Sequence, residues 1–381
     1  MLLQAGTVVT GSAVLCPGWL EIDGSRVTAL GKGQPDGPVD ESFPDDTVVP
    51  GFIDMHVHGG GGGAFGGWVE RGESAVRFHL RHGTTTMLAS LVTDTTETLT
   101  KQISGLVDLV NSGMLAGIHL EGPWLNARRA GAHRTTMLRD PSRDELDVLL
   151  AAGRGTVRMI TIAPERAGAL EAIRQITATG VVAAVGHTDA SYDTTVRAIS
   201  AGVTVGTHLF NAMRPVHHRN PGPIVALLED ERVTVELIGD GIHVHPALYR
   251  LAAVSGGALA LVTDATEAAG MPDGRHRLGD MDVDVRQGKA TVAGTDTLAG
   301  GTATMDALFR FALQNSASAG DDALLDAVTH SSTAAARALG IEGVGHLDTG
   351  AFADLVVLDG NHFPRAVLQR GQWVRGIKVA G

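Results

Sequence analysis

The sequence has little of what disulfide-stabilised, membrane-spanning or nucleic-acid-binding proteins depend on. Its single cysteine, Cys16, cannot form an intramolecular disulfide, so a reducing cytoplasm is the expected compartment. Residues 1–19 contain neither a basic segment nor a long apolar core, and we expect no signal peptide and no membrane span. The formal net charge is −12 without a basic block, which argues against a nucleic-acid partner. A small phosphorylated ligand stays compatible with this charge, because one local arginine can bind it.

The middle of the chain repeats one pattern, in which a short apolar, β-branched run ends in a polar residue and a helix-like segment follows. Eight such runs occupy residues 48–58, 84–91, 115–122, 157–165, 181–188, 202–212, 233–241 and 259–266. Helical periodicity lies between most of them, in residues 69–82, 95–110, 142–151, 168–178 and 191–201. Apolar strands that alternate with helices are typical of a buried parallel sheet. Eight units therefore predict an α/β fold, a (β/α)8 TIM-like barrel.

The two ends of the chain differ from the middle, because they read as short strands with glycine turns. At 381 residues we expect one large domain and one small one. We predict a small β domain from residues 1–49 plus 341–381, and a barrel over residues 50–340. Residues 273–293 predict a β-hairpin inserted after the eighth strand. The Ala- and Leu-rich residues 303–339 predict the last barrel helix and one more.

Polar residues end the predicted barrel strands, where barrel enzymes carry their functional groups. These residues are His56, His58, Glu121, His187, His208, Asp240 with His243 behind it, and Asp264. One histidine after an apolar run is usually structural, but several metal-ligand residues on one barrel face are hard to explain in that way. The pattern therefore predicts a metal centre at this face.

His56 and His58 are two positions apart, so their rings lie on the same side of a strand and can bind one metal. Glu121, His187 and His208 can complete one or two sites. Imidazole and carboxylate ligands suit zinc, and iron less exclusively. Such a metal lowers the pKa of a bound water and polarises a carbonyl, which indicates a metal-dependent hydrolase.

Many two-metal barrel hydrolases bridge their metals with a carboxylated lysine. The lysines here are at positions 32, 101, 289 and 378, none of them at a predicted barrel strand end. Glu121 would therefore take the bridging role if two metals bind. Asp264 is not needed as a ligand by count, and an aspartate beside the attacking water is a suitable proton shuttle.

Several motifs resemble those of known enzymes, in order and over nearly the whole chain. FIDMHVHG at 52–59 and DTGAFADLVVLD at 348–359 are similar to the opening and closing segments of the amidohydrolase superfamily. The more specific motifs are HLEGPWLN (119–126), GAH (131–133), GHTDA (186–190), THLFNAMRP (207–215), DGIHV (240–244), VTDAT (262–266) and TLAGGTATMD (297–306). Together they resemble the N-acetylglucosamine-6-phosphate deacetylase family, a cytoplasmic activity of amino-sugar metabolism.

The resemblance implies roles for individual residues. Glu121, His187 and His208 would form the core metal site, and His56 with His58 would hold a second metal, so one or two divalent ions per subunit are expected. Asp264 would be the catalytic acid/base, and His133 would polarise the acetyl carbonyl. The implied substrate-binding residues are Ala132, Asn211, Ala212, Arg219, His243 and Leu298. The resemblance also implies a homodimer, in which Arg219 reaches the phosphate in the neighbouring site.

Two other functions stay open at this point. Another amidohydrolase, acting on a different N-acyl sugar or a cyclic amide, would have the same metal site and a different pocket. A barrel without catalysis could serve as an assembly or binding protein. Such a protein would have lost metal ligands or the shuttle aspartate, whereas this sequence retains them all.

Overall fold

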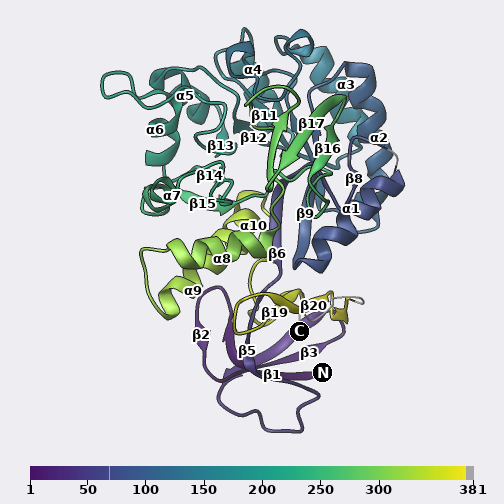
Figure 1. The fold of residues 1–381 in the computed structure, drawn as a ribbon, viewed down its shortest axis with the longest axis vertical. Coiled ribbons are helices and arrows are strands. Elements are labelled where there is room, and N and C mark those ends of the chain that lie inside the picture. Colours follow the sequence, from purple (N-terminus) through teal and green to yellow (C-terminus); the bar gives the residue numbers. More distant parts are fainter. Residues whose placement is uncertain (68, 375–381) are drawn as a thin grey trace. The chain divides into compact units, whose positions relative to one another are not determined.

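The structure is a computed structural model that describes residues 1–67 and 69–374 (Figure 1). Two compact units make up the chain. One unit contains Met1–Asp54, Arg77–Thr86 and the chain from Thr304 on, and the other contains Met55–Val76 and Met87–Ala303. These divisions do not coincide with the boundaries predicted after residues 49 and 340, which stay a prediction. Residues 375–381 of the predicted small domain, with the lysine at 378, lie outside the described residues.

Eight parallel strands follow one another around one sheet in the order in which they occur in the chain. They are β6 (Phe52–Val57), β9 (Thr84–Val92), β10 (Gly117–Glu121), β11 (Val157–Ile162), β12 (Val182–Val185), β13 (Val203–Gly206), β14 (Thr234–Leu237) and β15 (Ala258–Leu261). The first and last strands meet just beyond their ends, where the N–H of Asp264 donates to the carbonyl of His56 at 2.9 Å and that of His58 donates to Ala265 at 2.8 Å. These strands form the predicted (β/α)8 TIM-like barrel.

Helices alternate with the barrel strands (Figure 1). They are α1 (Val69–Arg81), α2 (Thr96–Asn111), α3 (Arg143–Gly153), α4 (Ala169–Ala178), α5 (Tyr192–Ser200), α6 (Gly222–Glu229) and α7 (Pro246–Ala253). The first five match the periodic segments of the sequence. Helix α3 begins with Ser142 as its N-cap, since the Ser142 side chain accepts from the N–H of Glu145 at 3.3 Å. Helices α6 and α7 were not predicted, because each has only eight residues and too few turns for a clear period. None of the helices in the described residues combines the length and apolar character that crossing a membrane requires.

Strands from both ends of the chain share a second sheet, as predicted. Its members are β1 (Leu2–Val9), β2 (Val14–Leu15), β3 (Gly18–Asp23), β4 (Arg26–Lys32), β5 (Glu41–Pro50), β19 (Leu355–Leu358), β20 (Pro364–Gln369) and β21 (Gln372–Trp373). Strand β19 pairs antiparallel with β5, so that Val357 lies opposite Val48. Buried Leu, Val and Ile side chains from both ends form one apolar cluster beneath this sheet. Neither end of the chain supplies that core alone.

Two predicted segments differ in detail from the structure. The insertion at 273–293 is a three-stranded antiparallel sheet rather than a hairpin, formed by β16 (Gly274–Leu278), β17 (Met281–Arg286) and β18 (Lys289–Val292). The glycine turn before Lys289 allows the third strand to fold back, since Gly288 has a φ of 74°. The stretch 303–339 forms α8 (Met305–Asn315) and one further helical segment, as predicted, but that second segment contains a π-helix. It consists of α9 (Asp321–Val328), the π-helix Thr329–Thr333 and α10 (Ala334–Ala338), which follow one another without a break.

Candidate metal centre and substrate pocket

The C-terminal ends of four barrel strands bring the five predicted metal ligands together. His56 lies in β6 and His58 follows that strand directly, while Glu121 is the last residue of β10. His187 follows β12 and His208 follows β13, each two residues past the end of its strand. All five side chains are buried. Strand order alone therefore gathers side chains that are up to 152 positions apart in the chain (208 − 56).

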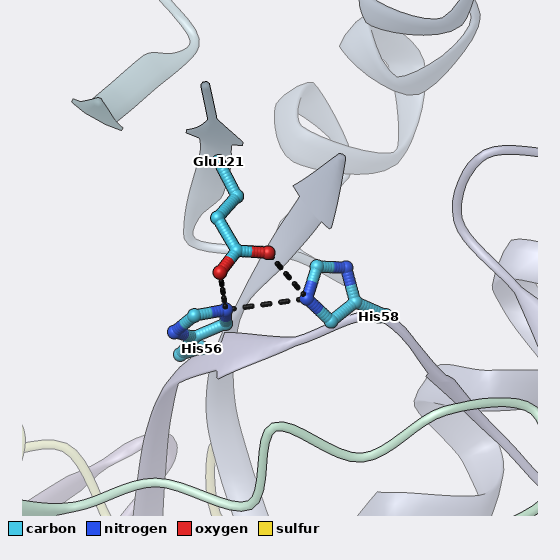
Figure 2. Close-up of side chains that lie close together, drawn as sticks. All are labelled: His56, His58 and Glu121. Carbon is cyan, nitrogen blue, oxygen red and sulfur yellow. Dashed lines mark hydrogen bonds and ion pairs between the residues drawn. The ribbon is translucent and has the colours of Figure 1, made fainter. Parts of the chain in front are cut away.

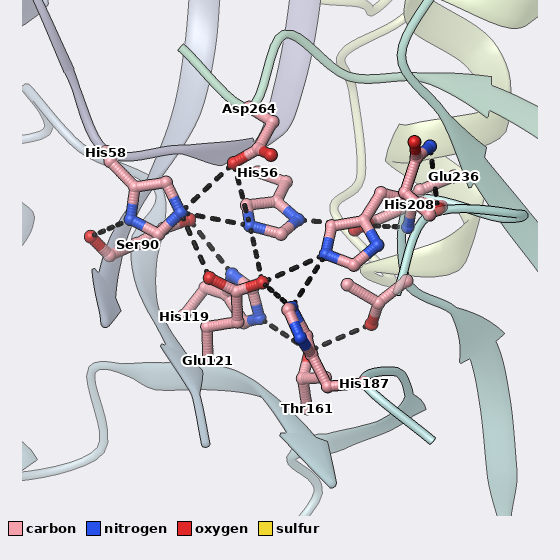
Figure 3. A network of polar contacts seen from close by, with 12 residues as sticks. His56, His58, Ser90, His119, Glu121, Thr161, His187, His208, Glu236 and Asp264 are labelled. Carbon is pink, nitrogen blue, oxygen red and sulfur yellow. Dashed lines mark hydrogen bonds and ion pairs between the residues drawn. The ribbon is translucent and has the colours of Figure 1, made fainter. Parts of the chain in front are cut away.

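Glu121 is the centre of this cluster, and the four imidazoles turn toward its carboxylate (Figure 3). Its Oε1 atom lies 2.9 Å from Nε2 of His187 and 3.0 Å from Nε2 of His208. The Nε2 atoms of those two histidines are themselves 3.0 Å apart. Three donor atoms so close together can all reach one divalent ion.

The carboxylate of Glu121 also faces the histidine pair of the first strand, with one oxygen toward each ring (Figure 2). Nε2 of His58 lies 3.2 Å from Glu121 Oε2, and Nε2 of His56 lies 3.6 Å from Oε1. The two Nε2 atoms are 3.2 Å apart, as expected for rings on the same side of a strand. Glu121 therefore stands between two pairs of histidines, in the position that a bridging ligand requires.

Acceptors behind the rings fix which nitrogen can bind a metal. Nδ1 of His58 lies 3.1 Å from the carbonyl oxygen of Ser90, and Nδ1 of His187 lies 2.8 Å from that of Arg129. A carbonyl oxygen can only accept, so each Nδ1 carries the proton and each Nε2 offers its lone pair. Burial, with the nearby charge of His133, also lowers the pKa of His187 to about 4, which keeps its ring neutral.

The buried carboxylates of the cluster favour the binding of a cation. Burial opposes charge on the ring of His58, yet hydrogen bonds to Asp264 and Glu121 raise its pKa to about 9. Burial likewise opposes charge on Asp264, but the neighbouring His56 and the hydrogen bond from His58 lower the pKa of its carboxyl to about 2. The pKa of Glu121 is also held well below its ordinary value, against its burial, by His133 and His56. Buried carboxylates whose negative charge is balanced by protonated imidazoles form a site that a divalent ion can occupy by displacing protons.

The donor set therefore fits a divalent metal. Each of the groups His56, His58, Glu121 and Glu121, His133, His187 has ligand atoms within 4.8 Å of one another. Imidazole nitrogens with a carboxylate suit zinc or iron and are less suited to calcium or magnesium, which prefer oxygen ligands.

Asp264 completes the cluster on the side of the open pocket. Its Oδ1 lies 3.2 Å from Nε2 of His58 and 3.5 Å from Nε2 of His56. Two glycines of the TLAGGTATMD segment pass directly behind it, and a Cβ on Gly300 would lie only 2.7 Å from the Asp264 carbonyl oxygen. A Cβ on Gly301 would lie 2.2 Å from the carbonyl oxygen of Thr263. These glycines therefore permit the close approach that supports the backbone of Asp264.

Strained backbone marks the same residues. His187, His208 and Asp264 have φ angles of 47°, 27° and 46°, in a region that side chains other than glycine rarely adopt. Ala212 has a φ of 50°. Each such conformation costs on the order of 1–3 kcal/mol and persists where the surroundings hold it, which is common at functional sites.

His133 differs from the ligand histidines in its hydrogen bonding. The backbone N–H of Thr93 donates to its Nδ1 at 3.4 Å, so in the neutral ring the proton is on Nε2. That Nε2 lies 3.3 Å from Glu121 Oε2. His133 is thus arranged to donate a hydrogen bond, whereas His58 and His187 are arranged to bind a metal.

A cavity of about 250 Å³ opens beside the cluster. Its lining includes four ligand residues (His58, Glu121, His187 and His208), together with His133 and Asp264. Five of the six predicted substrate-binding residues also line it: Ala132, Asn211, Ala212, His243 and Leu298. A ligand in this cavity would therefore contact the candidate reactive groups and the candidate binding groups at once.

Two of the predicted residues do not line the cavity. Arg219 is exposed and does not line the cavity, and its predicted contact with a neighbouring subunit stays a prediction. Asp240 lies three residues past β14, which ends at Leu237, just as Asp264 lies three residues past β15, which ends at Leu261. Asp240 instead accepts a hydrogen bond from Nδ1 of His243 at 2.7 Å and so orients that ring.

Sequence reasoning missed the polar residues that support the ligands. Glu236 is fully buried within β14, and its Oε2 lies 3.0 Å from Nδ1 of His56. His119 is buried beneath the cluster, where its ring lies 2.9 Å from the hydroxyls of both Ser90 and Thr161 (Figure 3). A signal was present, since a charged or polar residue inside an apolar barrel strand must have a buried partner.

Comparison with known proteins places these features in context. The sequence profile described as the amidohydrolase family matches residues 47–378. N-acetylglucosamine-6-phosphate deacetylase from Bos taurus is 40% identical over 352 residues, covering 87% of this chain and 84% of the relative. N-acetylgalactosamine-6-phosphate deacetylase from Escherichia coli O157:H7 is 34% identical over 334 residues, covering 86% of this chain and 87% of the relative.

A solved structure is similar over almost the whole chain. It is N-acetyl-D-glucosamine-6-phosphate deacetylase from Mycobacterium smegmatis, in a variant with one aspartate replaced by alanine, in complex with N-acetyl-D-glucosamine-6-phosphate. The identity is 54%, the TM-score is 0.96, and the match covers 98% of each chain. The structure of the Pasteurella multocida deacetylase, at 27% identity, has a TM-score of 0.91 and covers 98% of this chain and 99% of that one.

Proposed function

Because this chain belongs to the amidohydrolase family, we propose that it hydrolyses the acetamide of N-acetyl-D-glucosamine 6-phosphate to glucosamine 6-phosphate and acetate. The observation that carries the proposal is the convergence of four imidazole Nε2 atoms on the Glu121 carboxylate, with Asp264 beside His56 and His58, at the wall of a cavity. Deacetylases of this sugar phosphate with 40% and 54% identity support the choice of substrate. We expect a cytoplasmic enzyme with one or two zinc ions per subunit, or iron in their place.

The side chains divide the chemistry among them. A divalent ion held by Glu121, His187 and His208, with or without a second ion at His56 and His58, would activate water and polarise the amide carbonyl. Asp264 takes a proton from the attacking water and then passes it to the leaving nitrogen. His133 donates a hydrogen bond from Nε2 to the carbonyl oxygen as negative charge develops on it.

His133 offers a prediction that separates a hydrogen-bond donor from a metal ligand. Replacing it in His133→Ala removes one donor to the developing oxyanion, which typically costs about 10²–10³-fold in kcat. Metal content should stay at the wild-type level, because Nε2 of the neutral ring carries a proton. Steady-state kinetics and elemental analysis of the same preparation check both parts. Loss of a metal ion from this variant would instead make His133 a ligand.

The phosphate group needs a cation that the cavity of one chain does not supply. Among the described residues, the cavity lining contains no lysine and no arginine. His243 and the backbone near Asn211 and Ala212 offer hydrogen bonds but no permanent positive charge. We propose that Arg219 of a second copy supplies that charge in a homodimer, since its exposed position leaves it free to contact a neighbour.

Arg219→Ala should therefore affect the phosphorylated substrate selectively. A charge-assisted hydrogen bond contributes on the order of 1.5–3 kcal/mol, so kcat/KM on N-acetylglucosamine 6-phosphate should fall by roughly ten- to a hundredfold. The slow reaction with unphosphorylated N-acetylglucosamine should scarcely change. The measurement compares wild type and variant on both sugars. Equal losses on both would mean that Arg219 supports structure or the dimer rather than the phosphate.

The Escherichia coli relative makes the galactosamine epimer a second candidate substrate. Both sugars present the same acetamide and phosphate, so the metal centre does not distinguish them. A panel of the two 6-phosphates with wild-type enzyme decides between them. A higher kcat/KM for the galactosamine compound would transfer the assignment to that sugar and leave the amide chemistry unchanged.

A further inference from the structure

Glu236 is a buried carboxylate that contacts two of the candidate ligand residues, His56 and His208, and takes no part in the chemistry proposed above. It lies in the middle of β14 with an exposed fraction of 0%. Its Oε2 lies 3.0 Å from Nδ1 of His56 and accepts the backbone N–H of His208 at 3.2 Å. Its own carbonyl accepts the N–H of Leu209 at 2.7 Å. One residue thus holds a ring from one pair of histidines and the backbone of the other pair.

The contact with Glu236 determines which nitrogen of the His56 ring can bind a metal. A carboxylate only accepts, so Nδ1 of His56 donates to Glu236 and Nε2 presents its lone pair to the cluster. His58 and His187 make the corresponding hydrogen bond to neutral backbone carbonyls. Since a carboxylate partner makes an imidazole a stronger ligand than a carbonyl does, His56 is prepared to bind a cation more strongly than its neighbours.

The contacts with the His208 segment involve a strained turn. His208 has a φ of 27° and Phe210 a φ of 77°, and the two hydrogen bonds to Glu236 hold the backbone at the start of this turn. The same turn leads to Asn211 and Ala212 at the wall of the cavity. Glu236 can therefore transmit a displacement at His56 to the segment that carries His208.

Structural stability alone gives a poor explanation of Glu236. Its second oxygen, Oε1, is buried and accepts no hydrogen bond from the described residues. A buried carboxylate with an unsatisfied oxygen is costly, and an apolar side chain would fill the same space at lower cost. A bound cation at the far side of His56 offsets that cost by balancing the negative charge.

We propose that Glu236 is a positioning residue that acts through His56 to raise the affinity of the cluster for a divalent metal ion. The proposal rests on the metal-dependent function given above. It commits His56 to a direct role as a ligand of the second ion, beside His58. A carboxylate that orients a metal-binding histidine typically contributes 10–100-fold to metal affinity.

The test is a zinc titration of metal-stripped full-length protein, followed by calorimetry, for wild type, Glu236→Gln, His56→Gln and the double variant. Glu236→Gln keeps the size of the side chain but removes its charge, and we expect 10–100-fold weaker zinc binding at the His56 position. If Glu236 acts through His56, the double variant should bind no more weakly than His56→Gln alone. Wild-type affinity in Glu236→Gln, or additive losses in the double variant, would overturn the proposal.

Two further variants distinguish a direct effect on zinc affinity from an indirect effect of lower protein stability. Glu145→Gln neutralises another largely buried carboxylate, which binds Arg139 and the indole N–H of Trp124 but no metal ligand. It should lower the thermal stability and leave zinc affinity unchanged. Glu236→Asp keeps a carboxylate on a shorter stem and should bind zinc with intermediate affinity. If Glu236→Gln does not fold, Glu236→Asp tests the proposal in its place, because the shorter side chain draws the carboxylate back from Nδ1 of His56. Wild-type zinc affinity in Glu236→Asp would then contradict the proposal that this contact raises the affinity.

The proposed deacetylase activity can fail independently of this inference. Zinc titration needs no substrate, so it reports on Glu236 even if wild-type protein releases no acetate from the sugar phosphate. Conversely, acetate release with unchanged zinc affinity in Glu236→Gln would leave the enzyme assignment intact and remove only the role of Glu236.

Discussion

Removing the divalent metal should abolish acetate release, and adding zinc or iron back should restore it. Among the described residues, the ion-pair partners of Glu121 and Asp264 are histidines, and no lysine or arginine near them could replace a cation. Without a metal, no group in the cluster can both activate water and polarise the carbonyl. The measurement is acetate release by holoenzyme, chelated enzyme and reconstituted enzyme. Circular dichroism of the chelated form verifies that the barrel stays folded.

The individual ligands should differ in importance. His187 and His208 lie 2.9 and 3.0 Å from the same oxygen of Glu121, whereas Nε2 of His56 lies 3.6 Å from it. His187→Gln or His208→Gln should therefore lower activity more than His56→Gln does. His276→Gln, in the inserted sheet, is a control that should retain full activity, since its ring only contacts the carbonyl of Pro272. Full turnover in the absence of metal would contradict this part of the mechanism.

Asp264→Asn should lower kcat by about 10²–10⁴-fold, the usual value of a positioned acid/base, and by more if the group serves both proton transfers. Neighbouring His56 and His58 hold the pKa of Asp264 at about 2, so at neutral pH its carboxylate is ionised and ready to accept a proton. An amide at the same position cannot accept that proton. Because Asn is nearly the same size, the backbone at Gly300 and Gly301 should stay in place.

Metal analysis separates this effect from a loss of ligand. Asp264 Oδ1 lies 3.2 Å from Nε2 of His58, so the variant must be shown to retain its metal before its kinetics are interpreted. Single-turnover measurements with saturating substrate then report the chemical step itself. A kcat near the wild-type value in fully metallated Asp264→Asn would mean that the proton travels by another route.

The barrel and the clustering of the candidate ligands could be predicted because their signals are local in the sequence. Each barrel strand is a short apolar run, and parallel strands in a barrel place their C-terminal ends on one face. His56, Glu121 and His187 each lie at or just beyond such an end, so the topology alone brings them together. The small β domain could be predicted from what each end of the chain lacks. Each end has short strands but no core of its own, so the two ends are expected to pack together.

The supporting residues could not be found in the same way, because their roles depend on distances that spacing does not encode. Glu236 contacts His56 across 180 positions, and no sequence feature near either residue indicates that the two are in contact. Asp240 and Asp264 each lie three residues past the end of a barrel strand, and sequence position does not distinguish Asp240, which accepts from His243, from Asp264, which faces His56 and His58. The tautomer of His133 depends on the backbone N–H of Thr93, a donor that every non-proline residue carries.

The most direct test of the proposed function is acetate release by wild-type enzyme from N-acetylglucosamine 6-phosphate and from unphosphorylated N-acetylglucosamine, each with metal-loaded and metal-stripped protein. The proposed mechanism requires a cation for amide hydrolysis, and the proposed contact with Arg219 requires a phosphate on the sugar. We predict rapid release only from the phosphorylated sugar and only with metal bound. Equal rates on the two sugars, or undiminished release by stripped protein, would contradict it.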